Sequence, residues 1–437
     1  MADVPVVQIL DKNKNWSQAI VSLPGELPLP PLADSSLRVR TEIFSLTSNN
    51  FTYAKLGSLL GWWNFHPLPK STPEPYNNPA LYGRTNCWGY GRVLESTFPS
   101  VPKDSYVFGY LPIGTLPIDL QVTSGRIKGW VVENSPHRVD LMRVYNDYRV
   151  YPATPSSSSP SASPMSASSI ARRIGEKDDD LALDALLGIV HGIGYLMNNY
   201  IFPQDPAKLC HPSRGPAEAN PPWAFPEQAD LTDATALSFA PGAKTAVLFA
   251  HLLKYQRREG TRPRQVIGVT SESSRPFVVT TGLYDDVALT GENPVDVVTK
   301  RLGVDPASSS NKVVVVDFGG RRNVAADWVA ALRPVLPNLV FFVVGGAIPE
   351  PTTAGAGGDD GKDFNVTASF METAQRNAML GAEKYLAESR QSWEQVRERG
   401  IRGFSVKWGQ GMDSAREGWD ALARGDVLPE VGLAFKL

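Results

Sequence analysis

The sequence predicts an α/β protein in which a parallel-sheet domain is joined to a β-rich domain. After residue 235, continuous apolar runs alternate with amphipathic runs, as in a parallel sheet that helices cover on both faces. Before residue 150, short runs rich in glycine and aromatic residues predict a small barrel. The predicted strands of the parallel sheet are 235–240, 264–270, 285–289, 313–318 and 339–344, and the predicted helices lie near 243–257, 273–282, 294–303 and 323–333.

The composition is that of an ordinary folded protein. The 437 residues carry a net charge of −2, with 42% hydrophobic and 20% charged residues. We therefore expect about two or three domains, a small-molecule substrate, and no nucleic-acid or membrane partner. The two cysteines, Cys87 and Cys210, favour a reducing, cytoplasmic location over a disulfide framework. We also expect no apolar run long enough to span a bilayer.

The flanking regions divide into three parts. In the β-rich region, 37–47, 88–96 and 105–114 predict strands, whereas the Ser- and Pro-rich run 154–169 predicts a disordered insertion. Residues 180–202 are apolar at helical spacing and predict one or two buried helices. Towards the end of the chain, we expect a flexible loop at 352–363, a helix within 368–399, a further helix near 414–424 and a terminal strand at 431–437.

The turn between the first strand of the parallel sheet and its helix is a candidate phosphate loop. Backbone N–H groups at a helix start bind phosphate, and glycines let the backbone come close. Here Ala240 and Ala243 flank the glycine, and Pro241 removes an N–H donor. The turn is thus either a working cofactor loop, aided by a lysine and a hydroxyl, or a structural turn only. Its candidate cofactor-binding residues are Ser238, Gly242, Ala243, Lys244 and Thr245.

The end of the second strand, at 270–275, indicates which nucleotide the domain prefers. An NAD site places an acidic side chain there, whereas an NADP site places arginine and small hydroxyls around the 2′-phosphate. Ser271, Ser274 and Arg275 fit that phosphate and favour NADPH, while Glu272 either serves a ribose hydroxyl or repels the phosphate. The alternative is that a serine of this stretch only caps the next helix.

Further candidates for cofactor contact follow the fourth and fifth strands. Asp317 and Gly319 come after the fourth strand, and Gly345 comes after the fifth. Glycines at these points suit a close approach to a nucleotide, although ordinary turns use them equally. We expect no metal site, because the histidines and cysteines are scattered singly.

A polar cluster after the first long strand of the β-rich region is the candidate catalytic site. Asn49, Tyr53 and Lys55 lie close together in the sequence. Tyr53 is a candidate proton donor to a substrate carbonyl or enolate, and a nearby lysine would lower its pKa. The alternative is a tyrosine that only packs against its neighbours.

The order of these parts resembles the medium-chain dehydrogenase/reductase superfamily, and most closely a fungal and bacterial branch of unknown function. The resemblance covers most of the chain outside the insertions 154–169 and 352–363. It implies a GroES-like β-rich domain over 1–180, a Rossmann-type domain over 181–350, and a segment 351–437 that returns to the first domain. The stretches that carry it are NNFTYAKLG, CWGYGRV, FGYLPIG and LSFAPGAKTA with IGVTSESSRPFV.

The resemblance also implies an activity. Zinc-independent members of the superfamily transfer hydride from NADPH to an enone, quinone or carbonyl. It places Asn49 and Tyr53 near the nicotinamide and implies a small apolar or aromatic substrate, as in secondary metabolism. Two alternatives stay open: a non-redox lyase, cyclase or dehydratase, and a non-catalytic ligand-binding protein.

Overall fold

The computed structural model describes the chain in two compact units. Unit 1 comprises residues 1–186 and 405–437, and unit 2 comprises residues 187–404. Most of the expected insertion at 154–169, Gly345 and nearly all of the loop 352–363 lie outside the described residues. Those residues are 4–59, 61–153, 166–212, 222–306, 308, 311–319, 323–336, 338–344, 363–365, 378 and 381–437.

Unit 1 is built around an eight-stranded sheet in the order β16-β17-β3-β5-β6-β9-β8-β7, which closes because β3 also pairs with β7. A three-stranded sheet, β2-β1-β4, accompanies it. The strands are β1 (Val6–Asp11), β2 (Gln18–Ser22), β3 (Ser36–Leu46), β4 (Tyr82–Arg84), β5 (Asn86–Ser96), β6 (Tyr106–Pro112), β7 (Ile118–Ser124), β8 (Trp130–Glu133), β9 (Asp147–Tyr151), β16 (Ser405–Gln410) and β17 (Val431–Lys436).

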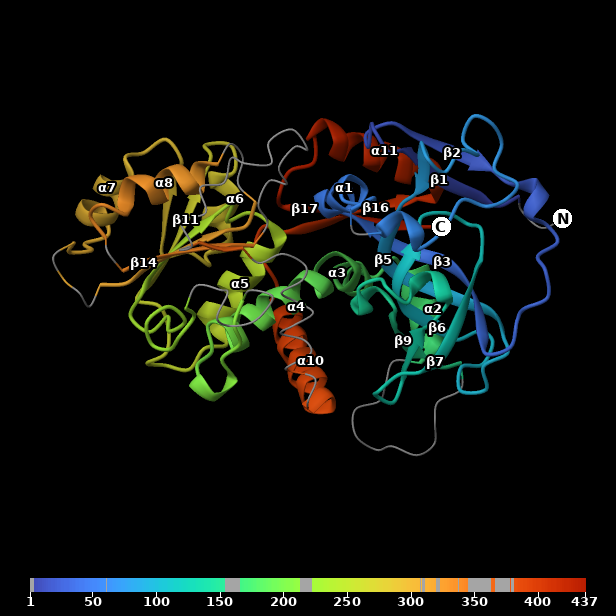
Figure 1. Cartoon of the computed structure of the whole chain (residues 1–437), viewed down its shortest axis with the longest axis horizontal. Coiled ribbons are helices and arrows are strands. Elements are labelled where there is room, and N and C mark those ends of the chain that lie inside the picture. Colours follow the sequence, from blue (N-terminus) through green and yellow to red (C-terminus); the bar gives the residue numbers. More distant parts are fainter. Residues whose placement is uncertain are drawn as a thin grey trace. The chain divides into compact units, whose positions relative to one another are not determined.

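The end of the chain completes the sheet of unit 1. Strand β17 pairs in antiparallel fashion with β3 and in parallel with β16, so the last strand lies between the two (Figure 1). Trp419 of α11 is fully buried in the core below, where its ring packs on Phe51. The prediction that a terminal strand returns to the N-terminal domain is therefore confirmed. The helices of this unit are α1 (Ser48–Lys55), α2 (Ala167–Gly175), α3 (Asp179–Leu183) and α11 (Gly411–Arg424).

Unit 2 contains a six-stranded, fully parallel sheet in the order β12-β11-β10-β13-β14-β15. In chain order this is 3-2-1-4-5-6, the order of the Rossmann fold, so the predicted fold class is confirmed. The order reverses between β10 and β13, and such sheets bind ligands beyond the carboxyl ends of their strands at that point. The strands are β10 (Thr235–Phe239), β11 (Gln265–Thr270), β12 (Asp286–Leu289), β13 (Val313–Asp317), β14 (Leu339–Val343) and β15 (Asp363–Asn365).

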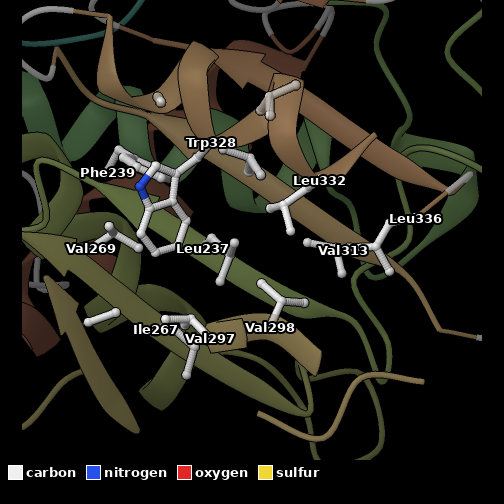
Figure 2. Close-up of a cluster of buried hydrophobic side chains, with 14 of the residues drawn as sticks. Leu237, Phe239, Ile267, Val269, Val297, Val298, Val313, Trp328, Leu332 and Leu336 are labelled. Atoms are coloured by element: carbon white, nitrogen blue, oxygen red, sulfur yellow. The ribbon is translucent and has the colours of Figure 1, made fainter. Parts of the chain in front are cut away.

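Apolar side chains join this sheet to its helices. Trp328 and Leu332 of α8 and Val297 of η9 lie over the strands, and the rings of Trp328 and Phe239 meet edge to face at 5.4 Å (Figure 2). Burial of such a cluster is the main favourable contribution to folding. The helices of unit 2 are α4 (Ile189–Leu196), α5 (Lys244–Tyr255), α6 (Arg275–Thr281), α7 (Pro294–Asp296), α8 (Val324–Leu332) and α10 (Ala382–Arg399), with π-helical turns η6 (Met197–Ile201) and η9 (Val297–Arg301).

Two buried histidines lie among α4, α5 and α10. The His191 ring approaches Ser392 Oγ through Nε2 at 2.9 Å, and Ser392 Oγ donates to Gln256 Oε1 at 2.6 Å. His251 is 1% exposed, and neither of its ring nitrogens has a hydrogen-bond partner in the described part of the chain. Burial lowers the pKa of His191 to about 3 and that of His251 to about 4, so both are neutral at physiological pH.

The expectation about apolar runs is wrong for one helix. The continuous helix at 179–201, which comprises α3, the π-helical turn η5 (Asp184–Gly188), α4 and η6, is long and apolar enough to cross a membrane. It is the one such helix among the described residues, and 61% of its most apolar window is buried inside the protein. The core helix of a globular protein has the same character.

Candidate functional site

The turn between β10 and α5 has an unusual backbone. Ala240 adopts a left-handed conformation with φ of +52°, and its carbonyl accepts a hydrogen bond from Ala243 N at 2.8 Å. A side chain in this region is strained, and glycine is the residue that adopts it freely. The turn is therefore tight, and alanine occupies its strained position.

Neighbouring elements fix this turn. The Tyr284 hydroxyl donates to the Pro241 carbonyl at 2.8 Å, and burial raises the pKa of Tyr284, so the tyrosine is neutral. Gly268 of β11 lets the loop approach, because a Cβ at that position would lie 3.2 Å from Pro241 and 3.1 Å from Val278. The turn is thus held before any ligand arrives.

Lys244 is the first residue of α5 and has no acidic partner among the residues that the structure describes. Its side chain is half-buried, and Nζ lies 5.7 Å from the centre of the Phe404 ring. Burial lowers the pKa of this lysine to about 8. The N-cap residue, Ala243, makes no side-chain hydrogen bond, so the N–H groups of the first turn lack a side-chain cap.

Cations at the start of α5 and α6 oppose the usual charge preference of helices. The positive end of the helix dipole favours acidic residues in the first turn. Acidic residues are found there in α7, α8, α10 and α11, but not in α5 or α6. Lys244 and Arg275 begin these two helices. An anion placed near them would relieve the unfavourable charge arrangement.

Hydroxyl groups and an arginine without an ion pair among the described residues follow the end of β11. Ser271 Oγ lies 3.1 Å from Ser273 Oγ and 3.4 Å from Ser274 Oγ. Arg275 is exposed and has no ion pair within the described residues, while the nearby Asp286 pairs with Arg301. These side chains suit a phosphate at the carboxyl end of β11.

The alternative of a serine cap at this helix is not supported. The N-cap residue of α6 is Ser274 rather than Ser271 or Ser273, and it makes no side-chain cap hydrogen bond. The hydroxyls face one another instead, and Glu272 is exposed. The reason is that 272–274 form a separate turn before the helix begins.

Asp317 and Gly319 lie at the end of β13, beside the β10 loop. Asp317 is buried and pairs in register with Phe239, and its Oδ1 accepts from Gly319 N at 3.0 Å. Gly319 has φ of +104°, which requires glycine. The carboxyl edge of the sheet therefore brings together all the cofactor-binding candidates of unit 2 that the structure describes: Ser238, Gly242, Ala243, Lys244, Thr245, Ser271, Ser274, Arg275, Asp317 and Gly319.

Tyr53 lies in an aromatic cluster of unit 1. It is 6% exposed, and its hydroxyl accepts a hydrogen bond from Trp88 Nε1 at 3.1 Å. The rings of Trp62, Tyr110 and Tyr145 meet it edge-on at 4.8, 5.3 and 5.8 Å. Burial raises the pKa of Tyr53 despite hydrogen bonds from neighbours. Tyr53 is thus protonated at neutral pH.

The two predicted companions of Tyr53 differ in their placement. Asn49 precedes it by one helical turn and hydrogen-bonds to it, which partly offsets the effect of burial on its pKa. Lys55 is exposed at the end of α1, and the prediction that it lowers the pKa of Tyr53 is wrong. Side chains two residues apart on a helix point in different directions. The largest effect on the pKa of Tyr53 is the desolvation of its hydroxyl group.

Several residues around these sites carry no signal in the sequence. Phe404 and Tyr284 contact the β10 loop region from distant segments, and the ring of Tyr145 joins the Tyr53 cluster. Within the described residues, no group of three or more histidine, cysteine or acidic side chains is placed to hold a metal ion.

Comparisons with known proteins support the fold. The model of a family described as "Protein of unknown function (DUF2855)" matches residues 44–428. No curated protein matches the sequence.

Among solved structures, a mutant enoyl thioester reductase from Candida tropicalis shares 11% identity with a TM-score of 0.53. A putative NADPH:quinone reductase from Bacillus thuringiensis shares 12% identity with a TM-score of 0.51. Each match covers 100% of both chains. At these identities the likeness shows the fold alone.

Proposed function

The chain belongs to the DUF2855 family of proteins of unknown function, and we propose that it is an NADPH-dependent reductase of a small enone, quinone or carbonyl compound. The observation that carries the proposal is a pair of cations, Lys244 and Arg275, which begin α5 and α6 at the carboxyl edge of the Rossmann sheet and have no ion pair among the described residues. The solved structures of similar fold include enzymes titled as enoyl and quinone reductases, which supports this reaction class.

Each cation has a separate role in the proposal. Lys244 and the first N–H groups of α5 bind the pyrophosphate. Arg275 and the adjacent serines bind the 2′-phosphate and so select NADPH over NADH. Asp317 and Gly319 line the edge beside the pyrophosphate loop. The residues present fit a phosphorylated dinucleotide, because Lys244 and Arg275 begin two helices at this edge without an ion pair among the described residues, while the exposed Glu272 beside them suits a ribose hydroxyl.

When bound, NADPH supplies a hydride to the substrate. Reduction of a double bond or carbonyl also requires one proton. We propose that Tyr53, which stays protonated because burial raises its pKa, supplies or orients that proton, with Asn49 hydrogen-bonded to its hydroxyl. The surrounding aromatic rings favour an apolar or aromatic substrate. The chemistry needs no metal.

Calorimetric titration of the full-length protein with NADPH and NADH tests the proposal. We expect NADPH to bind more tightly, and Arg275→Ala to reduce the preference at least tenfold, since a lost charge-assisted contact costs about 1.5 to 3 kcal/mol. Arg275→Lys retains a charge and should keep part of the preference. The absence of NADPH binding at millimolar concentration would overturn the proposal.

A non-catalytic ligand-binding protein is the second candidate. It is favoured by the burial of Tyr53 and by the contact of its hydroxyl with Trp88, which leave little of the group free. Consumption of NADPH with a panel of enones, quinones and aldehydes distinguishes the two. Tight binding without consumption of NADPH would support the ligand-binding protein.

A further inference from the structure

Phe404 of unit 2 lies beside the start of α5. It ends a short turn after α10, in which Phe404 N donates to the Ile401 carbonyl at 3.1 Å. Gly400 and Gly403 both have positive φ, of +69° and +79°. The turn is therefore a defined structure that glycine makes possible.

This turn is fixed against α6. A Cβ at Gly403 would lie 2.8 Å from the side chain of Thr280, and a Cβ at Gly282 would lie 1.8 Å from Arg402 Nη2. Gly403 therefore lies close against Thr280, and the positive φ values of Gly282 and Gly403, +61° and +79°, favour glycine on each side. Phe404, the next residue, is in this way placed with its ring 5.7 Å from Lys244 Nζ.

We propose that Phe404 is a positioning residue that sets the charge of Lys244 and thereby couples the binding of the cofactor phosphates to the uptake of a proton. The inference rests on the proposed function. An aromatic face attracts an ammonium group, while the apolar enclosure removes water from it. The attraction raises the pKa of Lys244, whereas the loss of water lowers it. The Phe404 ring determines the balance of the two effects.

The ionisable neighbours do not supply an alternative cause. Tyr284, which binds the loop from the other side, is neutral. Arg402 of the turn is directed to Gly282 at the end of α6. Desolvation alone accounts for the lowered pKa of Lys244, with no contribution from a charged group. No acidic group among the described residues acts on Lys244, so a bound phosphate would be its first partner of opposite charge.

The pH profile of NADPH affinity tests the proposal, with inorganic pyrophosphate as a second probe. For the wild type, we expect the affinity to fall from about pH 7 to about pH 9.5 as Lys244 loses its proton, and calorimetry in two buffers should detect proton uptake near pH 8. Lys244→Arg should abolish this fall because arginine stays charged.

Two substitutions of Phe404 should shift the profile in opposite directions. Phe404→Leu keeps the apolar cover but removes the aromatic face, so the midpoint should move down by about half to one pH unit. Phe404→Ala admits water, so the midpoint should move up towards that of an ordinary lysine. A loss of structure alone would change affinity without moving the midpoint in two directions. Phe202→Leu, the same change in a fully buried ring of unit 2 that packs on Trp223 and Phe342, is the matched control and should leave the midpoint unchanged.

A direct titration separates this inference from the proposed function. NMR of the ligand-free protein, labelled with ¹³C-lysine and assigned with Lys244→Arg, reports the pKa of Lys244 in each Phe404 variant. If NADPH and pyrophosphate fail to bind but the pKa shifts as expected, the proposed function and the proton-coupled binding are wrong, while the control of Lys244 by Phe404 stands. If the pKa is the same in wild type, Phe404→Leu and Phe404→Ala, the inference is overturned whatever the protein binds.

Discussion

The start of α5 and the cluster around Tyr53 differ in whether their polar groups have hydrogen-bond or ion-pair partners. At α5, Lys244 has no acidic partner within the described residues, and the helix start lacks a side-chain cap. Around Tyr53, the hydroxyl is hydrogen-bonded and the rings enclose it. Unsatisfied polar groups cost folding free energy unless a ligand or water satisfies them. The first region therefore has the character of an open binding site, whereas in the second the hydroxyl of Tyr53 is held in a defined orientation by its neighbours.

The largest expected effect is a loss of stability when Tyr53 is truncated. Tyr53→Ala should lower the free energy of unfolding by about 3 to 5 kcal/mol, because it leaves a cavity among buried rings. Lys244→Met should cause no such loss, since it removes a charge that has no acidic partner in the part of the chain that the structure describes. Urea unfolding measures both. Tyr53→Phe is the control and should cost about 1 kcal/mol. If Tyr53→Ala is as stable as the wild type, the cluster is an open site rather than a core.

The pH dependence of stability tests a third region, the histidines among α4, α5 and α10. The folded state lowers the pKa values of His191 and His251 to about 3 and about 4, below the value of about 6.5 for an unfolded chain. Their contribution is thus complete above pH 6.5 and is lost as the pH falls from there towards the folded pKa values.

We expect a loss on the order of 3 kcal/mol by pH 5 from these two groups. Urea unfolding at a series of pH values measures the loss. His251→Gln should flatten the slope between pH 6.5 and pH 4. An unchanged slope in this variant would show that carboxylates cause the acid sensitivity instead.

The smallest expected effect on stability concerns the turn between β10 and α5. Ala240→Gly removes a left-handed alanine and should stabilise the protein by up to about 1 kcal/mol, the steric gain being reduced by the greater freedom of glycine in the unfolded chain. Thermal unfolding measures this, and NADPH affinity should be kept or improved. A destabilised variant would mean that the alanine methyl group makes a packing contact that outweighs the strain.

The sequence predicted the parallel sheet better than the barrel, for a physical reason. Buried parallel strands are continuous apolar runs, so β10 to β14 fall close to the predicted ranges. β15, which comprises three residues without an apolar run, escaped prediction. In unit 1, β7 alternates exposed and buried residues, a strand pattern that the prediction missed, whereas its partner β8 has only four residues and ends in the charged Glu133.

The candidate site was predictable where it depends on local order in the chain. Lys244 and Arg275 each follow a strand directly, so their place at the carboxyl edge follows from the β-α-β pattern. The contact between Lys244 and Phe404 joins segments 160 residues apart (404 minus 244), and no local pattern encodes it. Burial of Tyr53 likewise depends on Trp62, Trp88 and Tyr145, which arrive from three other segments.

The position of β17 between β16 and β3 has a consequence for biosynthesis. The sheet of unit 1 needs strands from both ends of the sequence, whereas all of unit 2 lies between them. During translation, domains fold as their residues emerge from the ribosome. Unit 2 is therefore complete while β3 still exposes the edge that β17 will cover. Until residues 431–436 are synthesised, that edge is open to pairing with other chains.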